Sequence, residues 1–160
     1  GLIAGETAKS DPEAVRRLSE RFLWMLRDES GNNPGSAPEI LGEILRNTPD
    51  ELSDIAPVIM SFHDEEMLRC GVFRAAVRIS EKRPDLVNSS APLIKQYLKD
   101  DNALVRVYAV MLAGNLGLKE YISDIRALLN DNNFVRFYKD GDFQQFTVGK
   151  IAGQNVKILT

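Results

Sequence analysis

Apolar residues recur at helical spacing through most of this chain. Val15, Leu18, Phe22, Met25 and Leu26 follow one another at steps of three, four, three and one residue. This spacing places them on one face of an α-helix over 11–29, with charged residues largely on the other face. The same periodicity predicts further helices over 37–47, 50–62, 65–82, 86–99, 102–117 and 119–130.

Polar residues mark the starts of three of these helices. Ser10-Asp11-Pro12-Glu13, Ser36-Ala37-Pro38-Glu39 and Thr48-Pro49-Asp50-Glu51 each combine a hydroxyl, an early proline and a glutamate. In such a capping box the hydroxyl accepts a backbone N–H and the glutamate reaches back to the cap. We therefore expect the three hydroxyl residues to cap their helices.

The predicted helices form pairs that repeat along the chain. Two segments carry matching residues at a shift of 37 positions, namely Asp64 and Asp101, Leu68-Arg69 and Val105-Arg106, and Ala76 and Ala113. Units of this kind bury their apolar faces only against neighbouring units, so the repeat predicts stacked helix pairs. A non-repetitive helical bundle is the alternative.

The chain changes character after residue 131. Two aromatic, partly alternating runs, 134–138 and 142–147, are joined by Lys139-Asp140-Gly141, and Asp-Gly between such runs is typical of a β-hairpin. An isolated hairpin is marginally stable, so we expect it to cap the last helix pair, followed by a short helix near 148–152. The predicted fold is an all-α, α-α superhelix over 10–131 with a hairpin and terminal helix over 132–160, in a single domain, 1–160.

Composition and charge narrow the function classes. The net charge is −3, whereas a nucleic-acid binder usually carries a basic excess, so we expect no nucleic-acid partner. The single cysteine, Cys70, cannot form an internal disulfide, which is compatible with a reducing compartment and predicts a cytoplasmic location. No apolar run in the sequence approaches the roughly 18 residues of a membrane span.

The last helix pair carries a distinctive set of residues. They are an acidic turn at Asp101-Asn102, Val105-Arg106, Leu116-Gly117 between the helices, and a leucine-rich second helix that ends at Asp131. This unit resembles a HEAT or HEAT-like repeat of the PBS lyase type, and the resemblance covers about residues 37–131. The stretch 26–31 with 36–39 also looks like bacterial HEAT-like proteins of uncertain role.

The resemblance implies both a structural role for certain residues and a function. In these families the repeat arginine pairs with acidic groups, so Arg69 and Arg106 are expected to pair with acidic side chains, Asp64 and Asp101 being the candidates. Most such proteins are scaffolds, which implies a non-enzymatic module that binds another protein. Some relatives act on nucleic acid bases or a bilin-type cofactor, and an enzyme of that kind is the alternative.

The residues that could carry chemistry are few. One histidine, His63, and one cysteine do not make a zinc site without several carboxylates, so we expect no metal and no cofactor. An enzyme would need a pocket that holds Trp24 or Tyr108 beside a carboxylate such as Asp28. A nucleic-acid-binding repeat would need an uninterrupted basic stripe of Arg69, Arg74, Arg78, Lys82 and Arg83.

The first helix and the loop after it form the candidate contact region for a partner. Leu23 and Trp24 widen the apolar stripe of this helix, which indicates that something packs on both of its sides. Polar groups gather in the following loop, and loops held by rigid helices often carry function. The candidate binding residues are Trp24, Asp28, Glu29, Asn32 and Asn33.

Overall fold

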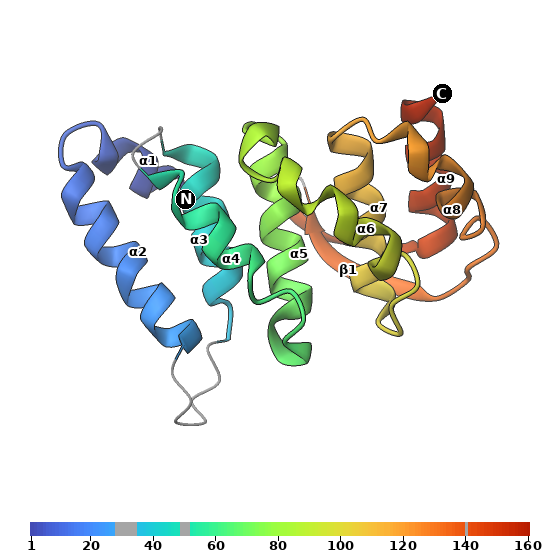
Figure 1. Ribbon diagram of the computed structural model, residues 1–160, viewed down its shortest axis with the longest axis horizontal. Coiled ribbons are helices and arrows are strands. Elements are labelled where there is room, and N and C mark those ends of the chain that lie inside the picture. Colours follow the sequence, from blue (N-terminus) through green and yellow to red (C-terminus); the bar gives the residue numbers. More distant parts are fainter. Residues whose placement is uncertain (28–34, 49–51, 140) are drawn as a thin grey trace. The chain divides into compact units, whose positions relative to one another are not determined.

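The computed structural model describes residues 1–27, 35–48, 52–139 and 141–160 (Figure 1). The described residues form nine α-helices and one two-stranded antiparallel hairpin near the carboxyl end, which confirms a mainly helical fold with a hairpin. The chain divides into two compact units, Gly1–Val87 and Asn88–Thr160. The boundary after Val87 falls near the start of the helix predicted over 86–99.

The first unit contains five helices and a short 3-10 turn. In chain order they are α1 Leu2–Ala8, α2 Pro12–Arg27, α3 Ala37–Asn47, α4 Ile55–Met60, α5 Glu66–Ser80 and η2 Pro84–Leu86. Helix α3 lies between α2 and α5 and contacts both (Figure 1). The predicted helix over 37–47 matches α3 at both ends.

Helix α1 is absent from the sequence-based prediction because its buried residues are small. Gly5 and Ala8 face the rest of the unit, whereas Leu2 and Ile3 are exposed. A Cβ added at Gly5 would lie 2.5 Å from the carbonyl oxygen of Asn47, so α1 approaches the end of α3 closely. A helix that packs through glycine and alanine shows no stripe of large apolar residues.

The capping residues differ from those predicted. Asp11, not Ser10, caps α2 by accepting the N–H of Ala14 at 2.9 Å, while the hydroxyl of Ser10 donates to the carbonyl of Thr7 at the end of α1. Ser36 precedes α3 without a side-chain capping bond. The hydroxyl of Thr48 donates back to Ile44, and the rest of its predicted box, 49–51, lies outside the described residues.

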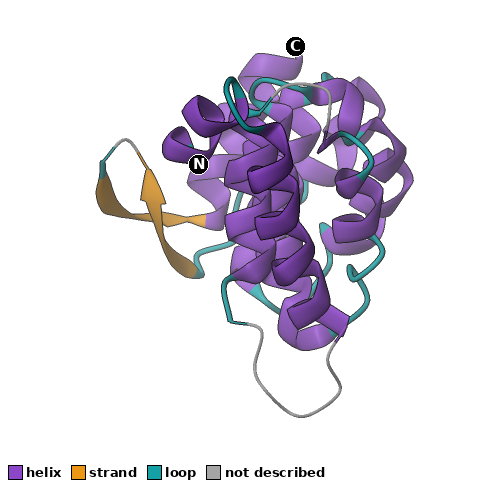
Figure 2. Ribbon diagram, turned by 90° about the vertical axis from the view of Figure 1, so that its left-hand side faces the viewer, coloured by secondary structure: helices purple, strands orange, loops and turns teal. Residues whose placement is uncertain are grey.

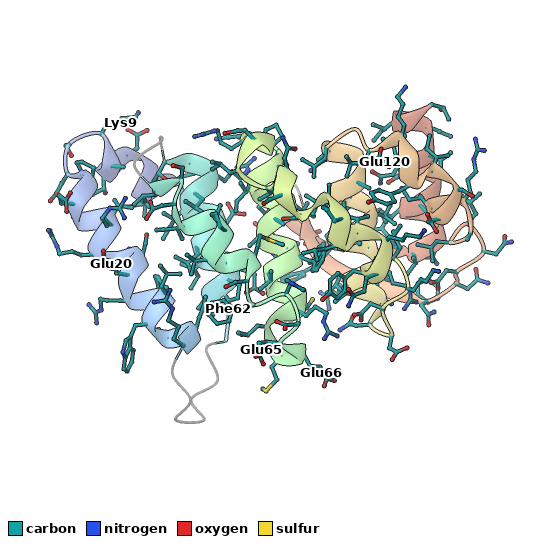
Figure 3. The ribbon with its side chains drawn as sticks, viewed as in Figure 1. Lys9, Glu20, Phe62, Glu65, Glu66 and Glu120 are labelled. Carbon is teal, nitrogen blue, oxygen red and sulfur yellow. The ribbon has the colours of Figure 1, made fainter. Side chains whose placement is uncertain are left out.

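Helices α3 and α5 form the core of the first unit. Leu41, Ile44 and Leu45 of α3 and Val72 and Ile79 of α5 are buried. A Cβ added at Gly42 would lie 2.6 Å from the Cα of Ala75, so the two helix backbones nearly touch at this point. Side chains of α2, α3 and α5 fill the space between these helices (Figure 3).

The second unit contains four helices, two 3-10 turns and the hairpin. In chain order they are η3 Asn88–Ser90, α6 Ala91–Tyr97, α7 Ala103–Asn115, η4 Lys119–Tyr121, α8 Ile122–Arg126, β1 Phe134–Lys139, β2 Asp142–Thr147 and α9 Val148–Leu159. Helices α6 and α8, like α4, are shorter than predicted. Pro57 and Pro92 sit in the first turns of α4 and α6, where a missing N–H costs least, and this places each helix start close to its proline.

The hairpin forms where the sequence predicts it (Figure 2). Val135 pairs with Phe146 and Phe137 with Gln144, and Gly141 adopts a φ of +90° beside the turn. The ring of Phe137 packs edge-on against Tyr108 of α7 at a centroid distance of 6.0 Å, so the hairpin lies against the last helices as expected. The predicted short helix near 148–152 is longer, because α9 continues to Leu159 and packs on α7 and α8.

Within the described residues, no helix combines the length and the apolar character needed to cross a membrane.

Candidate functional site

The side chain of Trp24 projects into solvent from α2 and is 67% exposed. On a helix, residues three, four and seven positions away share its face, and those that the structure describes are Arg17, Glu20, Arg21 and Arg27, all exposed. We call these five residues the Trp24 face; Figure 3 labels Glu20 on α2. The other predicted binding residues, Asp28, Glu29, Asn32 and Asn33, lie outside the described residues.

The Trp24 face is positively charged. It contains three arginines and one glutamate, and the ion pairs found among the described residues involve none of these arginines. The apolar stripe of α2 covers Val15 and Leu26 on the opposite side, while Leu23 is half-buried. The indole therefore does not belong to the core of the first unit.

The repeat arginines have the same local contacts in both units. Arg69 donates to the carbonyls of His63 at 3.2 Å and Asp64 at 3.0 Å, and Arg106 donates to those of Asp100 at 2.6 Å and Asp101 at 3.1 Å. Each arginine thus reaches back to carbonyls five and six positions earlier. These contacts fasten the turn that precedes each helix.

The carboxylate partner of Arg106 is Asp131 rather than the expected Asp101. Two guanidinium nitrogens bond to one oxygen of Asp131 at 2.8 and 3.0 Å, and the two side chains are only 11% and 13% exposed. Burial acts to raise the pKa of Asp131, but hydrogen bonds from Asn133 and Arg106 outweigh it and hold the pKa below its ordinary value. This pair is a structural element of the second unit.

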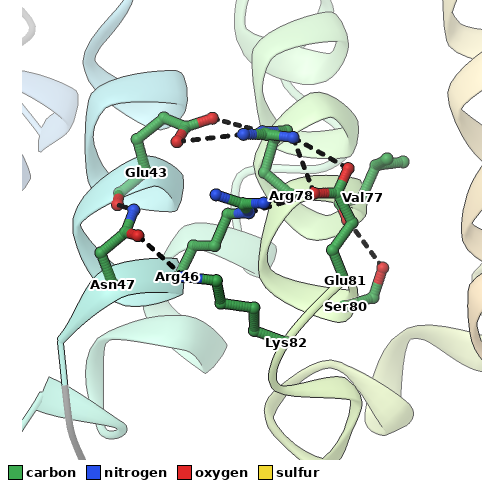
Figure 4. A network of polar contacts seen from close by, with 8 residues as sticks. All are labelled: Glu43, Arg46, Asn47, Val77, Arg78, Ser80, Glu81 and Lys82. Atoms are coloured by element: carbon green, nitrogen blue, oxygen red, sulfur yellow. Dashed lines mark hydrogen bonds and ion pairs between the residues drawn. The ribbon is translucent and has the colours of Figure 1, made fainter. Parts of the chain in front are cut away.

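A polar network joins α3 to the end of α5 (Figure 4). Arg78 bonds to both carboxylate oxygens of Glu43 and, at 2.7 and 2.9 Å, to Glu81. Arg46 bonds to the same Glu81 at 3.0 Å, and Lys82 donates to the side-chain oxygen of Asn47 at 3.0 Å. The network therefore links the two helices through three residue pairs, Glu43 with Arg78, Arg46 with Glu81 and Asn47 with Lys82.

The network keeps the carboxylate of Glu43 ionised. Burial acts to raise the pKa of Glu43, but the hydrogen bond and charge of Arg78, with the charge of Arg46, lower it below its ordinary value. The pKa of Arg78 is raised, because bonds and charges of Glu43 and Glu81 outweigh its desolvation. Both partners are thus ionised at neutral pH.

An open pocket of about 700 Å³ lies beside this network. Three helix ends meet there: Lys9 follows α1 (Figure 3), Arg46 lies in the last turn of α3, and Lys82 and Arg83 follow α5. The lining residues are Gly5, Lys9, Arg46, Asn47, Thr48, Lys82 and Arg83. All of them belong to the first unit.

Other residues considered from the sequence occupy structural positions. Tyr108 is buried in the second unit against Phe137, and Trp24 does not line the pocket described above. Arg78, which the basic stripe requires, is held by two carboxylates. In the described ranges, no three His, Cys, Asp or Glu side chains gather as metal ligands.

Comparison of the chain with protein-family models, with curated proteins and with solved structures found no match. The candidate sites therefore stand on their own geometry.

Proposed function

We propose that this protein is a non-enzymatic, HEAT-like repeat module whose paired helices form a short α-α superhelix and which binds another protein through the Trp24 face. The observation that carries the proposal is the exposure of Trp24, at 67%, among three exposed arginines. The matching carbonyl contacts of Arg69 and Arg106 support the assignment of equivalent repeat positions.

The energetic argument starts from the indole. Tryptophan is a large apolar side chain, and covering the exposed two thirds of it would remove about 100–170 Å² from water, worth about 3–4 kcal/mol at roughly 25 cal/mol per Å². Tryptophan and arginine are also the residues most enriched among those that dominate binding energy at protein interfaces. Trp24 with Arg17 and Arg21 has this composition.

The charge of the face defines the partner. Arg17, Arg21 and Arg27 outnumber Glu20, so a partner with an acidic surface around an apolar cleft complements it. The arginines steer the encounter and the indole supplies the buried contact. Binding should therefore weaken as the salt concentration rises, since exposed charges are screened over about 8 Å at physiological ionic strength.

Affinity capture with three immobilised versions of the protein tests the proposal. Trp24→Ala removes the indole, and Met67→Ala removes a comparably exposed apolar side chain, 78% exposed on α5. We expect an acidic protein to bind the wild type and Met67→Ala alike and Trp24→Ala about 30-fold or more weakly, the size of a strong interface residue. Arg21→Glu should slow association of the same partner.

Circular dichroism establishes that the variants are folded, since Trp24 contributes little to the core. If every captured protein binds Trp24→Ala with wild-type affinity, the Trp24 face is not the binding surface. If Met67→Ala loses the partner and Trp24→Ala retains it, the surface lies on α5 instead.

A further inference from the structure

We propose that the pocket between the ends of α1, α3 and α5 binds a phosphate-bearing small molecule, of the sugar phosphate class. This site is separate from the Trp24 face, and no residue is common to the two. The proposal starts from the lining: among the described residues that surround the pocket, four are cations and none is a carboxylate. Those cations are Lys9, Arg46, Lys82 and Arg83.

The network beside the pocket has more positive than negative charge. Glu43 and Glu81 are its two carboxylates, and they face three cations, Arg46, Arg78 and Lys82. Glu81 is shared between both arginines. The contact of Lys82 is the neutral amide oxygen of Asn47, so this contact leaves the ammonium charge uncompensated at the edge of the pocket.

Of the remaining two cations, only Lys9 is held by a weak pair. Lys9 pairs with Glu6, where the side chains are 68% and 75% exposed, and an exposed ion pair of this kind contributes little stability because water screens it. Arg83 is held more firmly, because it donates two parallel hydrogen bonds to Asp85 at 3.2 and 3.0 Å and is itself only 26% exposed. A bound dianion would therefore compete for Lys9 first, since it faces several cations at once.

The preference for positive side chains at the carboxyl end of a helix explains a single cation, but it does not explain why cations from three helix ends gather at one pocket. Positive side chains are favoured near the carboxyl end of a helix, which accounts for Arg46 in the last turn of α3. That effect acts within one helix. Lys82 instead crosses from the end of α5 to a side chain of α3, and Lys9 arrives from a third helix.

The donors and the dimensions define the ligand. Ammonium and guanidinium groups that approach from three segments suit a tetrahedral dianion better than a planar carboxylate. A volume of about 700 Å³ exceeds that of bare phosphate and falls in the range of small-ligand sites. The hydroxyl of Thr48 donates to the carbonyl of Ile44, so its oxygen remains as an acceptor for a ligand hydroxyl, whereas the side-chain oxygen of Asn47 already accepts from Lys82.

Titration of the full chain with glucose 6-phosphate, glucose and inorganic phosphate tests the proposal, with calorimetry and amide chemical shifts as readouts. Lys82→Gln removes a charge at an exposed position, and Lys95→Gln is the matched control, because Lys95 is an exposed lysine on α6 that lies outside the pocket and outside the Trp24 face. We expect saturable binding of glucose 6-phosphate, about tenfold weaker in Lys82→Gln and unchanged in Lys95→Gln. Inorganic phosphate should bind more weakly with the same dependence on Lys82, and glucose should not bind.

Several results would overturn the proposal. The first is that glucose 6-phosphate shows no saturable binding at millimolar concentration. The second is that the wild type and Lys82→Gln bind it with equal affinity. The third is that the amide chemical shifts of Asn47, Thr48 and Lys82 do not change on titration. A short single-stranded oligonucleotide that binds through Lys82 while glucose 6-phosphate does not would show that the pocket recognises a nucleic acid backbone instead. Circular dichroism confirms that Lys82→Gln is folded before its affinity is compared.

Discussion

Removing Arg106 should destabilise the second unit more than any exposed charge change. The guanidinium of Arg106 bonds to Asp131 at 2.8 and 3.0 Å and to the carbonyls of Asp100 and Asp101 at 2.6 and 3.1 Å. Arg106→Ala deletes all four contacts at once. It also leaves the carboxylate of Asp131, which is 13% exposed, without its cation.

The expected loss follows from burial. Breaking a buried ion pair by removing one partner costs about 3–5 kcal/mol, because the remaining charge is desolvated and uncompensated. Asp131 keeps two hydrogen bonds from Asn133, at 3.0 and 2.7 Å, so we place the loss near about 3 kcal/mol, the lower end of that range. A domain is typically stable by only about 5–15 kcal/mol, so the effect is large.

Urea unfolding followed by circular dichroism measures the effect, with a double-mutant cycle to isolate the pair. The cycle combines Arg106→Ala with Asp131→Asn. The reference cycle uses Lys9→Ala and Glu6→Gln, a pair that is 68% and 75% exposed. Coupling between Arg106 and Asp131 should exceed about 1 kcal/mol, whereas the exposed pair should couple by only about 0.2–1 kcal/mol.

Two results would refute this reasoning. Coupling energies of equal size in the two cycles would mean that burial does not strengthen the Arg106 pair. A loss below about 1 kcal/mol in Arg106→Ala, comparable to a surface change, would mean that the four contacts are absent in solution.

Two further predictions concern the junction of α3 and α5. The pKa of Glu43 is lower in the folded protein than its ordinary value of 4.5, so its ionised form adds stability that is complete above that value and is lost as the pH falls through the folded pKa. Glu43→Gln should therefore lose less stability than the wild type between about pH 6 and about pH 3 in thermal unfolding, and identical slopes would contradict the assignment. Gly42→Ala gains about 1 kcal/mol of helix propensity but places a Cβ 2.6 Å from the Cα of Ala75, so separation of the helices should make it less stable by about 1–2 kcal/mol net. Gly153→Ala in α9, where the added Cβ meets only a leucine methyl at 3.6 Å, should be neutral or stabilising in the same unfolding assay, and a loss equal to that of Gly42→Ala would refute the clash.

The elements that the sequence predicted well are those with strong local signals. Pro38 in the first turn and a regular stripe over 37–47 define α3, and Asp-Gly between aromatic runs defines the hairpin. Periodicity does not predict α1, because this helix packs through small residues such as Gly5 and therefore shows no apolar stripe. Periodicity also does not distinguish 3-10 turns from α-helix, so the helices predicted over 86–99 and 119–130 are longer than α6 and α8.

The candidate sites were predictable to different degrees. Trp24 is visible in the sequence because it widens the apolar stripe of its helix, although only the structure shows that the indole lies in solvent. The pocket leaves no such signal. Lys9, Arg46 and Lys82 are separated by more than thirty residues each and meet because three helices end at one place. Spacing along the chain cannot predict that meeting without the helix packing.

The contacts of Arg69 and Arg106 show which interactions recur with the 37-residue period and which do not. Arg69 and Arg106 make the same contacts to carbonyls five and six residues earlier, so the 37-residue period is satisfied within each turn. Their longer contacts do not follow from that period, since Asp131 lies 25 residues after Arg106. Residues outside these turns, including Trp24 and Lys82, are therefore not required by the repeat. Selection for a partner or a ligand can act on such positions without disturbing the turns.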